Sequence, residues 1–397
     1  MPNPLRGAAA ITGLGMTPMG RIYGKSTMEL AADAVRTAIA DAGLQKDQVD
    51  GLLINAGITG STGGGLTLGL QNYLGMRNLK LLNHMNAAGS TAAQMVQYAT
   101  MAIAAGMATH VVCVFADNPL KEGSSSGAAY GSAARSPSRP KGMAGLYAAA
   151  GYFGANTPYA LAARRHMAVY GTTQDQLGAI AVAQRAWATK NPLAQMRDPM
   201  TLDDYHSSRW IIEPLHLLDC CLVSNGAVAV IVSPASVAKD MAQPPVYIHG
   251  MGQGHPGDPA RAGGDWETET GGQIAAKTVY AMAGVGPSDV TVAELYDCYT
   301  YTVLVTLEDY GFCKKGEGGP FVEDGKLGPG GSLPTNTGGG ELSGYYMWGM
   351  TPLSEAIIQG RGQGGDRQAP DNDVILCTGN GGSLSYHAAL ILSPHAN

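Results

Sequence analysis

The stretch Ala8-Ala-Ala-Ile-Thr-Gly-Leu-Gly15 decides the fold, because its pattern of a short apolar strand closed by glycines returns as Pro245-Val-Tyr-Ile-His-Gly-Met-Gly252. A segment with apolar residues at helical spacing follows each strand, at residues 27–42 and 274–282. Each helix is predicted to stop at a glycine, a common left-handed terminator. The two stretches therefore predict two copies of one strand–helix unit.

The two copies stay in register beyond the helices. Aligning the two helix-ending glycines places the apolar strand that starts at Val49 on the one that starts at Val290, with the same offset of 241 residues. A third pair of apolar strands follows in the same order, at residues 110–116 and 374–378. Strand–helix units also recur by chance in α/β proteins, but three matched elements in order favour a duplication.

Strands that alternate with helices indicate a mainly parallel sheet covered on both faces. We therefore predict an α/β chain with a duplicated, layered α-β-α fold and a pseudo-twofold axis. The first half would comprise residues 1–240 and the second half residues 241–397. The region around 118–222 has no equivalent in the second half, so it is predicted to be an inserted loop or lid, where substrate selectivity often resides.

Composition limits the classes of function. Charged residues make up 14% of the chain, against about 25% in an average globular protein, so we expect a copy of the chain or a partner to bury part of the surface. The net charge of −6 argues against a nucleic-acid binder. The absence of an 18-residue apolar run and of a signal-peptide pattern predicts a cytoplasmic protein without a membrane span. The six cysteines lack the paired spacing of zinc sites, so we expect reduced thiols and no metal.

Candidate functional residues gather at glycine-rich turns that follow predicted strands. The first turn runs from Asn86 through Gly89 into a predicted helix over residues 92–105. Small residues let such a helix begin deep in the core, where its free N–H groups form an anion or oxyanion site. The alternative is that Asn86 is only a helix cap and that the small residues allow close helix packing.

The second turn, Tyr296-Asp297-Cys298-Tyr299, places tyrosines and a carboxyl group directly after a strand. Tyrosine has a pKa near 10 and exchanges protons readily when a cation, a dipole or a hydrogen-bond donor lowers that value. The alternative is that these rings pack in the core with their hydroxyls satisfied.

Two further turns carry glycines. Residues 336–346 contain three successive glycines and end in Tyr345 and Tyr346, before a predicted helix over 352–360, which indicates close approach of the backbone to a ligand. The last predicted strand ends at residues 377–383, a flexible turn with exposed N–H groups in this interpretation. No turn follows the nucleotide-binding pattern of strand, GxGxxG and helix.

At these four turns the sequence resembles the thiolase superfamily along nearly its whole length, and more narrowly its sterol-carrier or lipid-transfer-protein branch. That branch carries its acyl-accepting cysteine in a Cys-Ala-Thr-Gly-Ser-Thr-Ala turn, and Asn86 stands at the cysteine position. The family's Asn-Glu-Ala-Phe, Gly-His-Pro and Cys-x-Gly-Gly motifs fall on residues 296–299, 344–346 and 377–380. In this alignment Tyr345 replaces the histidine that activates the cysteine.

Thioester exchange needs a thiolate and a base, so these replacements disfavour thiolysis. The chain looks most like a subgroup of lipid-transfer-type enzymes that are CoA-thioester aldolases lacking the cysteine. The resemblance implies retro-aldol cleavage of a β-hydroxyacyl-CoA, such as a steroid side-chain thioester, into a ketone or aldehyde and a shorter acyl-CoA. It implies no cofactor beyond the CoA of the substrate and a small partner protein with a zinc ribbon and an OB-fold. The low charge content fits a homodimer to which this partner is added.

For this reaction we expect Tyr296 and Tyr345 to act as acid and base, in either order. Backbone N–H groups near Asn86 and Gly379, with the Asn86 side chain, would bind the thioester oxygen, because an oxyanion donor is typically worth about 10²–10³ in rate. Three further residues are expected to lie beside the substrate: Asp297, Cys377 and Tyr346.

Two other functions stay open. A thiolase-type acyltransferase could use a displaced cysteine such as Cys377, and thiol alkylation with iodoacetamide would then abolish activity. A non-catalytic subunit would bind acyl-CoA and turn over no β-hydroxyacyl-CoA. The sequence does not identify the acyl group.

Overall fold

The computed structural model describes residues 3–58, 66–129, 141–152, 154–257 and 268–396. The strands are β1 (Ala9–Met16), β2 (Gly51–Ala56), β3 (Leu81–His84), β4 (Val111–Asp117), β5 (Trp210–Ile212), β6 (Leu215–His216), β7 (Gly226–Pro234), β8 (Val246–Gly254), β9 (Val292–Glu294), β10 (Ile375–Gly381) and β11 (Tyr386–Ser393).

The α-helices are α1 (Thr27–Asp41), α2 (Leu70–Leu74), α3 (Thr91–Ala104), α5 (Gly142–Ala149), α6 (Asn156–Tyr170), α7 (Gln174–Ala188), α8 (Leu202–Ser207), α9 (Ala235–Ala238), α11 (Gly272–Ala283), α12 (Thr300–Asp309), α13 (Gly318–Phe321) and α14 (Met350–Gly360). Short helical turns are η1 (Lys46–Gln48), η2 (Ser126–Ala128), η3 (Leu217–Asp219), η4 (Pro287–Asp289), the π-helix η5 (Gly340–Gly344) and η6 (Gly365–Arg367).

The main sheet has nine strands in the order β3-β2-β4-β7-β1-β8-β11-β10-β9. Its two sides mirror each other about the contact between β1 and β8, where Ala10 lies opposite Tyr247. Going outward, β1, β7, β4 and β2 correspond to β8, β11, β10 and β9. This order confirms the predicted duplicated α/β fold, and the division at residue 240 stays a prediction.

The prediction of a mainly parallel sheet is wrong. The pairs β2–β3, β2–β4 and β9–β10 are parallel, whereas β4–β7, β1–β7, β1–β8, β8–β11 and β10–β11 are antiparallel. Strand β7 in the first half and strand β11 in the second run antiparallel to their neighbours, and neither is reached through a crossover helix common to both halves. The strand–helix alternation at the start of each copy therefore did not reveal the antiparallel strand at its end.

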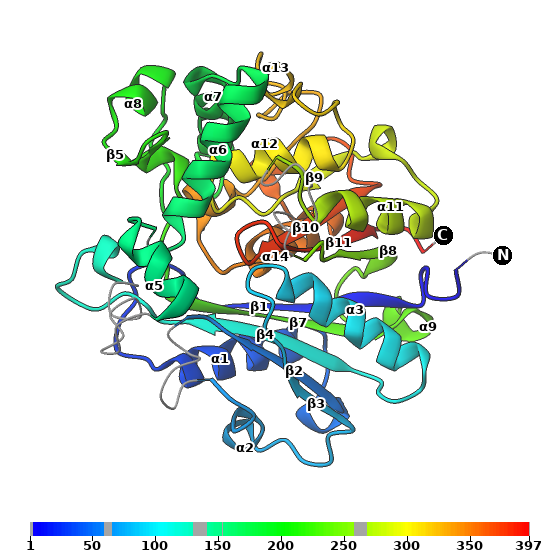
Figure 1. Cartoon of the computed structure of the whole chain (residues 1–397). Coiled ribbons are helices and arrows are strands. Elements are labelled where there is room, and N and C mark those ends of the chain that lie inside the picture. Colours follow the sequence, from blue (N-terminus) through cyan, green and yellow to red (C-terminus); the bar gives the residue numbers. More distant parts are fainter. Residues whose placement is uncertain (1–2, 59–65, 130–140, 153, 258–267, 397) are drawn as a thin grey trace.

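Helices form layers around the two half-sheets (Figure 1). Helix α1 packs on β1 and β7, and its counterpart α11 packs on β8 and β11. Helices α3 and α14 contact strands of both halves and contact each other, so they lie between the half-sheets. The N-termini of these two central helices carry the turns that were singled out in the sequence.

The helix boundaries follow local sequence. Ser26 caps α1: its Oγ accepts the Glu29 N–H at 3.2 Å, and the Glu29 carboxylate accepts the Ser26 N–H at 2.8 Å. Gly43 and Gly284, which end the two matched helices, both have a φ of 70°. The predicted left-handed terminators are therefore confirmed at both positions.

The inserted region lies mostly on the second half. It contains α5 to α8 and the β5–β6 ribbon, and Figure 1 shows α6, α7 and α8 together beside α12. Helix α7 contacts both α12 and the π-helix η5. The insertion is thus placed to supply side chains to the turn before α14.

No helix in the described ranges is both long and apolar enough to cross a bilayer. Within the same ranges no group of three or more His, Cys, Asp or Glu side chains is placed to hold a metal ion. All six cysteines are described, and all are free thiols.

Candidate active site

Two turns of the same shape begin the central helices α3 and α14. In the first, the Ala87 N–H donates to Thr91 Oγ1 at 2.7 Å, and in the second the Met347 N–H donates to Thr351 Oγ1 at 2.9 Å. The offset between these residues is 260 positions. The two turns therefore have one hydrogen-bond pattern, with different side chains on it.

The backbone angles agree with this match. Ala88 and Trp348 both adopt a left-handed conformation, with φ of 51° and 50°. Non-glycine residues rarely take such angles, and in proteins they cluster at functional sites. Asn86 comes directly before Ala87 in the first turn, and Tyr346 comes directly before Met347 in the second. Tyr346 is therefore the counterpart of Asn86.

Tyr346 pairs with Tyr296. Their hydroxyl oxygens lie 3.1 Å apart, and either one can be the donor. Tyr296 is 4% exposed, whereas Tyr346 is only half-buried. Burial is the largest of the effects that raise the pKa of each phenol well above its ordinary value. The pair is thus a neutral hydrogen-bonded couple at neutral pH, accessible from the Tyr346 side.

Tyr345 lies elsewhere. Its hydroxyl is 2.7 Å from Ser354 Oγ, inside the first turns of α14, and the side chain is 3% exposed. Ser354 Oγ donates to backbone carbonyls of its own helix, so Tyr345 is the donor in this contact. The Tyr345 hydroxyl therefore contacts Ser354, and the tyrosine whose hydroxyl contacts Tyr296 is Tyr346.

The Tyr296 ring lies directly on the first turn. A Cβ at Gly89 would overlap ring atoms of Tyr296, so only glycine leaves room for this contact. The Tyr296 N–H also donates to Thr378 Oγ1 at 3.2 Å, which fixes the residue against β10. Tyr296 therefore contacts both the first turn and strand β10.

The predicted flexible turn at residues 377–383 is wrong in its first part. The chain from Ile375 to Gly381 is a regular strand that pairs with β11 throughout. Glycines are required here because a Cβ at Gly379 would lie 2.7 Å from the Gly89 carbonyl oxygen. Gly379 therefore lies against the first turn, as expected for a residue of the site. It lies in strand β10 and not in a flexible turn.

Cys377 is buried within β10 and is 1% exposed. Burial, and to a smaller extent Glu294, raise the pKa of its thiol. Burial is also the first cause that raises the pKa of the other five cysteines: Cys113, Cys220, Cys221, Cys298 and Cys313. No cysteine of this chain is therefore a ready thiolate nucleophile.

Asp297 holds the chain segment that precedes the second turn. Its carboxylate accepts the N–H of Glu341 at 2.8 and 2.9 Å and that of Leu342 at 3.2 Å, both in η5. Burial raises its pKa to about 7, against the lowering effect of these hydrogen bonds. Asp297 thus positions the chain that leads to Tyr346.

Asn86 is exposed at the start of the first turn. Its Oδ1 accepts the Ala88 N–H at 3.0 Å, which orients the side-chain amide. The accepting oxygen is occupied by the turn itself, so the amide NH₂ is the part of Asn86 suited to a ligand oxygen. Ser90, not Asn86, is the N-cap of α3, so the interpretation of Asn86 as a helix cap is wrong. The oxyanion role of Asn86 stays a proposal.

The sequence missed two residues that contact the site, Tyr159 and Ser224. Tyr159 of the insertion accepts a hydrogen bond from Asn380 Nδ2 at 3.3 Å. Ser224 Oγ accepts the Tyr346 N–H at 3.0 Å and so holds that residue in place. No sequence pattern marks these two positions. The equivalence of Tyr346 to Asn86, by contrast, could have been found by matching the Gly-x-Thr at residues 89–91 with that at residues 349–351.

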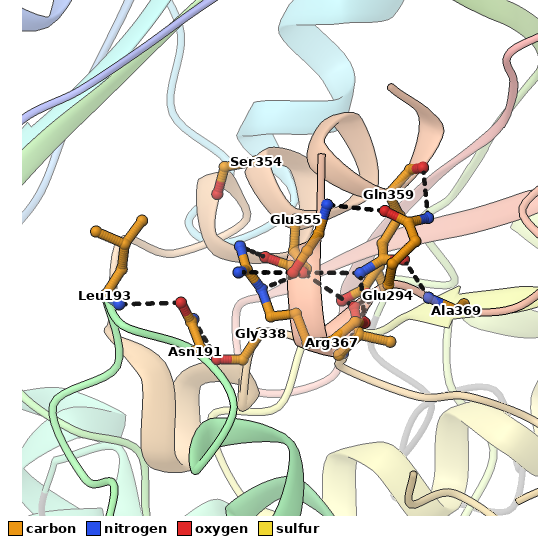
Figure 2. A network of polar contacts seen from close by, with 12 residues as sticks. Asn191, Leu193, Glu294, Gly338, Ser354, Glu355, Gln359, Arg367 and Ala369 are labelled. Carbon is orange, nitrogen blue, oxygen red and sulfur yellow. Dashed lines mark hydrogen bonds and ion pairs between the residues drawn. The ribbon is translucent and has the colours of Figure 1, made fainter. Parts of the chain in front are cut away.

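A buried polar network fixes the glycine run behind Tyr345 (Figure 2). Arg367 binds both Glu355 oxygens, with Nε at 2.8 Å and Nη2 at 3.2 Å. Asn191 of the insertion donates to the Gly338 carbonyl at 2.8 Å. Figure 2 shows Glu294 in the same network, which joins Asn191 of the insertion and the Gly338 backbone to α14.

Comparison with known proteins places the chain in a family. Residues 217–394 match the family described as thiolase C-terminal domain-like. A steroid side-chain-cleaving aldolase of Thermomonospora curvata is 39% identical over 386 residues, covering 95% of this chain and 96% of that protein. The chain belongs to the thiolase superfamily, in its SCP2-thiolase-like branch.

Other relatives of this SCP2-thiolase-like chain support the same family assignment. A 17-hydroxy-3-oxo-4-pregnene-20-carboxyl-CoA lyase of Mycobacterium tuberculosis is 36% identical over 386 residues, covering 95% of this chain and 97% of the lyase. A solved structure, the Ltp2-ChsH2(DUF35) aldolase, aligns with a TM-score of 0.85 at 36% identity, covering 98% of this chain and 99% of that one. A monomeric SCP2-thiolase-like protein of Mycobacterium smegmatis aligns with a TM-score of 0.72 at 19% identity, and it shows the fold alone.

Proposed function

We propose that this SCP2-thiolase-like chain is a carbon–carbon lyase that cleaves a β-hydroxyacyl-CoA, such as a steroid side-chain thioester, by a retro-aldol reaction. The observation that carries the proposal is the Tyr296–Tyr346 pair, with hydroxyls 3.1 Å apart beside the first glycine turn. The two relatives named as an aldolase and a lyase, each matched over 95% of this chain, support the same chemistry.

The reaction needs one proton removed and one returned. One hydroxyl of the pair takes the proton of the substrate's β-hydroxyl and passes its own proton to the other hydroxyl across their 3.1 Å contact, as the bond between the α- and β-carbons breaks. The β-carbon becomes a carbonyl, and the bonding electrons form the enolate of the thioester. The other hydroxyl protonates the α-carbon, which gives the shorter acyl-CoA, so the pair returns to its starting state with no external acid, base or cofactor.

The enolate oxygen needs hydrogen-bond donors. We assign this role to the Asn86 amide and to backbone N–H groups where Gly379 meets the first turn. A Cβ at Gly379 would crowd the Gly89 carbonyl oxygen, so β10 and the first turn are in direct contact here. Donors fixed before the reaction are the most effective way to stabilise such a charge.

An acyltransferase is disfavoured by the cysteines. Burial raises the pKa of all six thiols, and Cys377 lies inside a paired strand. A thioester exchange would require one of them to ionise and to reach the substrate. Iodoacetamide is therefore expected to leave the aldolase activity intact.

The partner expectation is part of the proposal. The aligned aldolase structure is named as Ltp2 with ChsH2(DUF35), which supports a complex with a DUF35 partner. That this partner carries a zinc ribbon and an OB-fold is the expectation from the family resemblance. The homodimer is proposed on the low charge content, which is 14%. Both assemblies can be measured by light scattering of the chain alone and after co-expression.

The test is product analysis. Purified protein, with and without a co-expressed DUF35 partner, is mixed with a series of β-hydroxyacyl-CoAs that includes a steroid side-chain thioester. We expect a ketone or aldehyde and a shorter acyl-CoA in equal amounts. Formation of a new thioester from added CoA, blocked by iodoacetamide, would instead establish an acyltransferase, and binding without turnover would establish a non-catalytic subunit.

A further inference from the structure

A small internal cavity touches both Asp297 and Glu355, the carboxyl groups of the two polar networks described above. All of its lining residues are buried, and they include Glu294 and Asn336 as well. The space open to the centre of a water-sized sphere is about 10 Å³. One water molecule needs about that much room, so the cavity matches a water and no larger ligand.

Asn336 offers this cavity a hydrogen-bond donor. The residue is 1% exposed and holds a left-handed conformation, with φ of 52°. Its Oδ1 accepts the Leu295 N–H at 2.6 Å, which fixes the orientation of the amide. Its Nδ2 has no hydrogen-bond partner in the part of the chain that the structure describes. Buried donors of this kind are normally satisfied, so Nδ2 calls for an acceptor inside the cavity that Asn336 lines.

The Asp297 carboxylate lies near this amide. Burial raises the pKa of Asp297 to about 7, and the Asn336 amide is among the neighbouring groups that lower it. Both residues line the cavity. The two groups are nevertheless not hydrogen-bonded, since Nδ2 finds no acceptor among the described residues. A donor and an acceptor separated in this way are suited to a bridging water.

Thr337 shows that Glu294 carries a proton. The Thr337 hydroxyl oxygen lies 2.7 Å from Glu294 Oε1 and 3.0 Å from Glu355 Oε1. A hydroxyl donates one proton and accepts through its lone pairs, so this geometry is satisfied when one of the two carboxyls is protonated. Arg367 binds both oxygens of Glu355 and keeps that group ionised. The protonated carboxyl is then Glu294.

Burial and charge at Glu294 agree with this arrangement. Burial, followed by the charge of Glu355, raises the pKa of Glu294 well above its ordinary value. The N–H and the hydroxyl of Thr337 both contact Glu294 at Oε1, so Oε2 can accept a further hydrogen bond. Figure 2 shows Glu294 beside Glu355, and both residues line the cavity. Glu294 therefore supplies the cavity with an uncharged acceptor.

We propose that the cavity binds one water molecule, which joins the Asp297 support of η5 to the Glu294–Glu355 network. The water accepts a hydrogen bond from Asn336 Nδ2 and donates its two protons to the Asp297 carboxylate and to Glu294 Oε2. Three hydrogen bonds are usual for a buried water, and each of these groups then has a partner. No proton is gained or lost by the network.

This water ties the chain before the second turn to the helix after it. Asp297 accepts the Glu341 N–H at the start of η5, which leads to Tyr346, and Glu355 lies on α14. The water site does not depend on the reaction that the chain catalyses. Failure of the proposed lyase function therefore leaves the water site in place and testable.

The test is a crystal structure of the full chain at a resolution that resolves single water molecules. We expect one peak of density in the cavity, within about 2.7–3.2 Å of Asn336 Nδ2 and of an Asp297 carboxylate oxygen. A cavity without density, or a direct hydrogen bond between Asn336 Nδ2 and Asp297, would overturn the proposal.

Glu294→Gln and Glu355→Gln form a matched pair, because each exchanges one buried carboxyl for an amide of the same shape. Gln resembles a neutral Glu294, so this variant should keep the water and unfold within about 2 °C of the wild type. In Glu355→Gln, Arg367 loses its ionised partner, and the unfolding temperature should fall by about 4 °C or more. Equal changes in the two variants, or loss of the water in Glu294→Gln, would contradict a neutral Glu294 beside the water.

Discussion

The turns before α3 and α14 share one backbone and differ in chemistry. Each has a left-handed residue and a threonine that accepts an N–H from within the turn. The first begins with the exposed amide of Asn86, and the second with the half-buried phenol of Tyr346, bonded to Tyr296. A duplicated scaffold thus offers two equivalent positions, and in the proposed function one binds an oxygen atom and the other moves a proton.

The surroundings of the two turns explain the difference. The second turn is held by Asp297 through η5, by Ser224 and by the insertion. The first turn is packed mainly by glycines of β10 and by the Tyr296 ring. Rigid support suits a proton-transfer pair, whose geometry must be kept to a fraction of an ångström.

The largest expected effect is the loss of either tyrosine hydroxyl. Tyr296→Phe and Tyr346→Phe remove the proton-transfer groups but keep the rings, so we expect kcat to fall by about 10³-fold or more. The measurement is steady-state formation of the carbonyl product, with circular dichroism to verify the fold. Activity within about tenfold of wild type in both variants would contradict the assignment of the second turn.

The next effect tests the first turn. Asn86→Ala removes the amide NH₂ from the proposed oxyanion site, and we expect kcat to fall by about 10²-fold with the unfolding temperature nearly unchanged, since the side chain is exposed. Asn86→Asp serves as a control, because it keeps the acceptor that caps the turn and removes the donor. A normal rate in Asn86→Ala would leave only backbone N–H groups for the oxyanion.

A third prediction concerns the support under the second turn. Because burial raises the pKa of Asp297 to about 7, the folded protein holds this proton more tightly than the unfolded chain. The free energy of unfolding therefore falls as the pH rises above the pKa of Asp297 in the unfolded chain. The fall ends near the pKa of Asp297 in the folded protein. Relative to Asp297→Asn, the wild type should lose roughly 2 kcal/mol of unfolding free energy between about pH 5.5 and 7.

Urea unfolding at several pH values measures this difference. A gap between wild type and Asp297→Asn that stays constant with pH would show that Asp297 does not titrate in this range.

The smallest effect is expected for Tyr345→Phe. This change removes one buried hydrogen bond, to Ser354, so we expect a loss of about 1 kcal/mol in unfolding free energy. The activity should stay within about threefold of wild type. Thermal unfolding and product formation measured on one preparation check both values.

The sequence predicts the architecture better than the site. The offset of 241 between matched strands identifies the duplication, because strands, helices and terminating glycines are encoded locally. Gly379 and its neighbours misled the prediction for β10: glycines usually indicate a turn, but here they clear space for the Gly89 carbonyl, a contact between distant segments.

The site shows the same limit. Tyr345 and Tyr346 are adjacent, so a motif alignment that shifts by one residue exchanges them, and only the hydrogen bonds separate their roles. Tyr159 comes from an insertion without a recognisable pattern. Glu341 stands in a glycine-rich stretch where nothing local distinguishes a buried carboxyl from an exposed one.

The most direct test of the central claim is the pair Tyr345→Phe and Tyr346→Phe, assayed side by side for release of the carbonyl product from a β-hydroxyacyl-CoA. The two changes remove the same atom from neighbouring residues, so general effects on folding are matched. We predict a loss of about 10³-fold or more for Tyr346→Phe and near-normal turnover for Tyr345→Phe. The reverse order would contradict the assignment of catalysis to the Tyr296–Tyr346 pair.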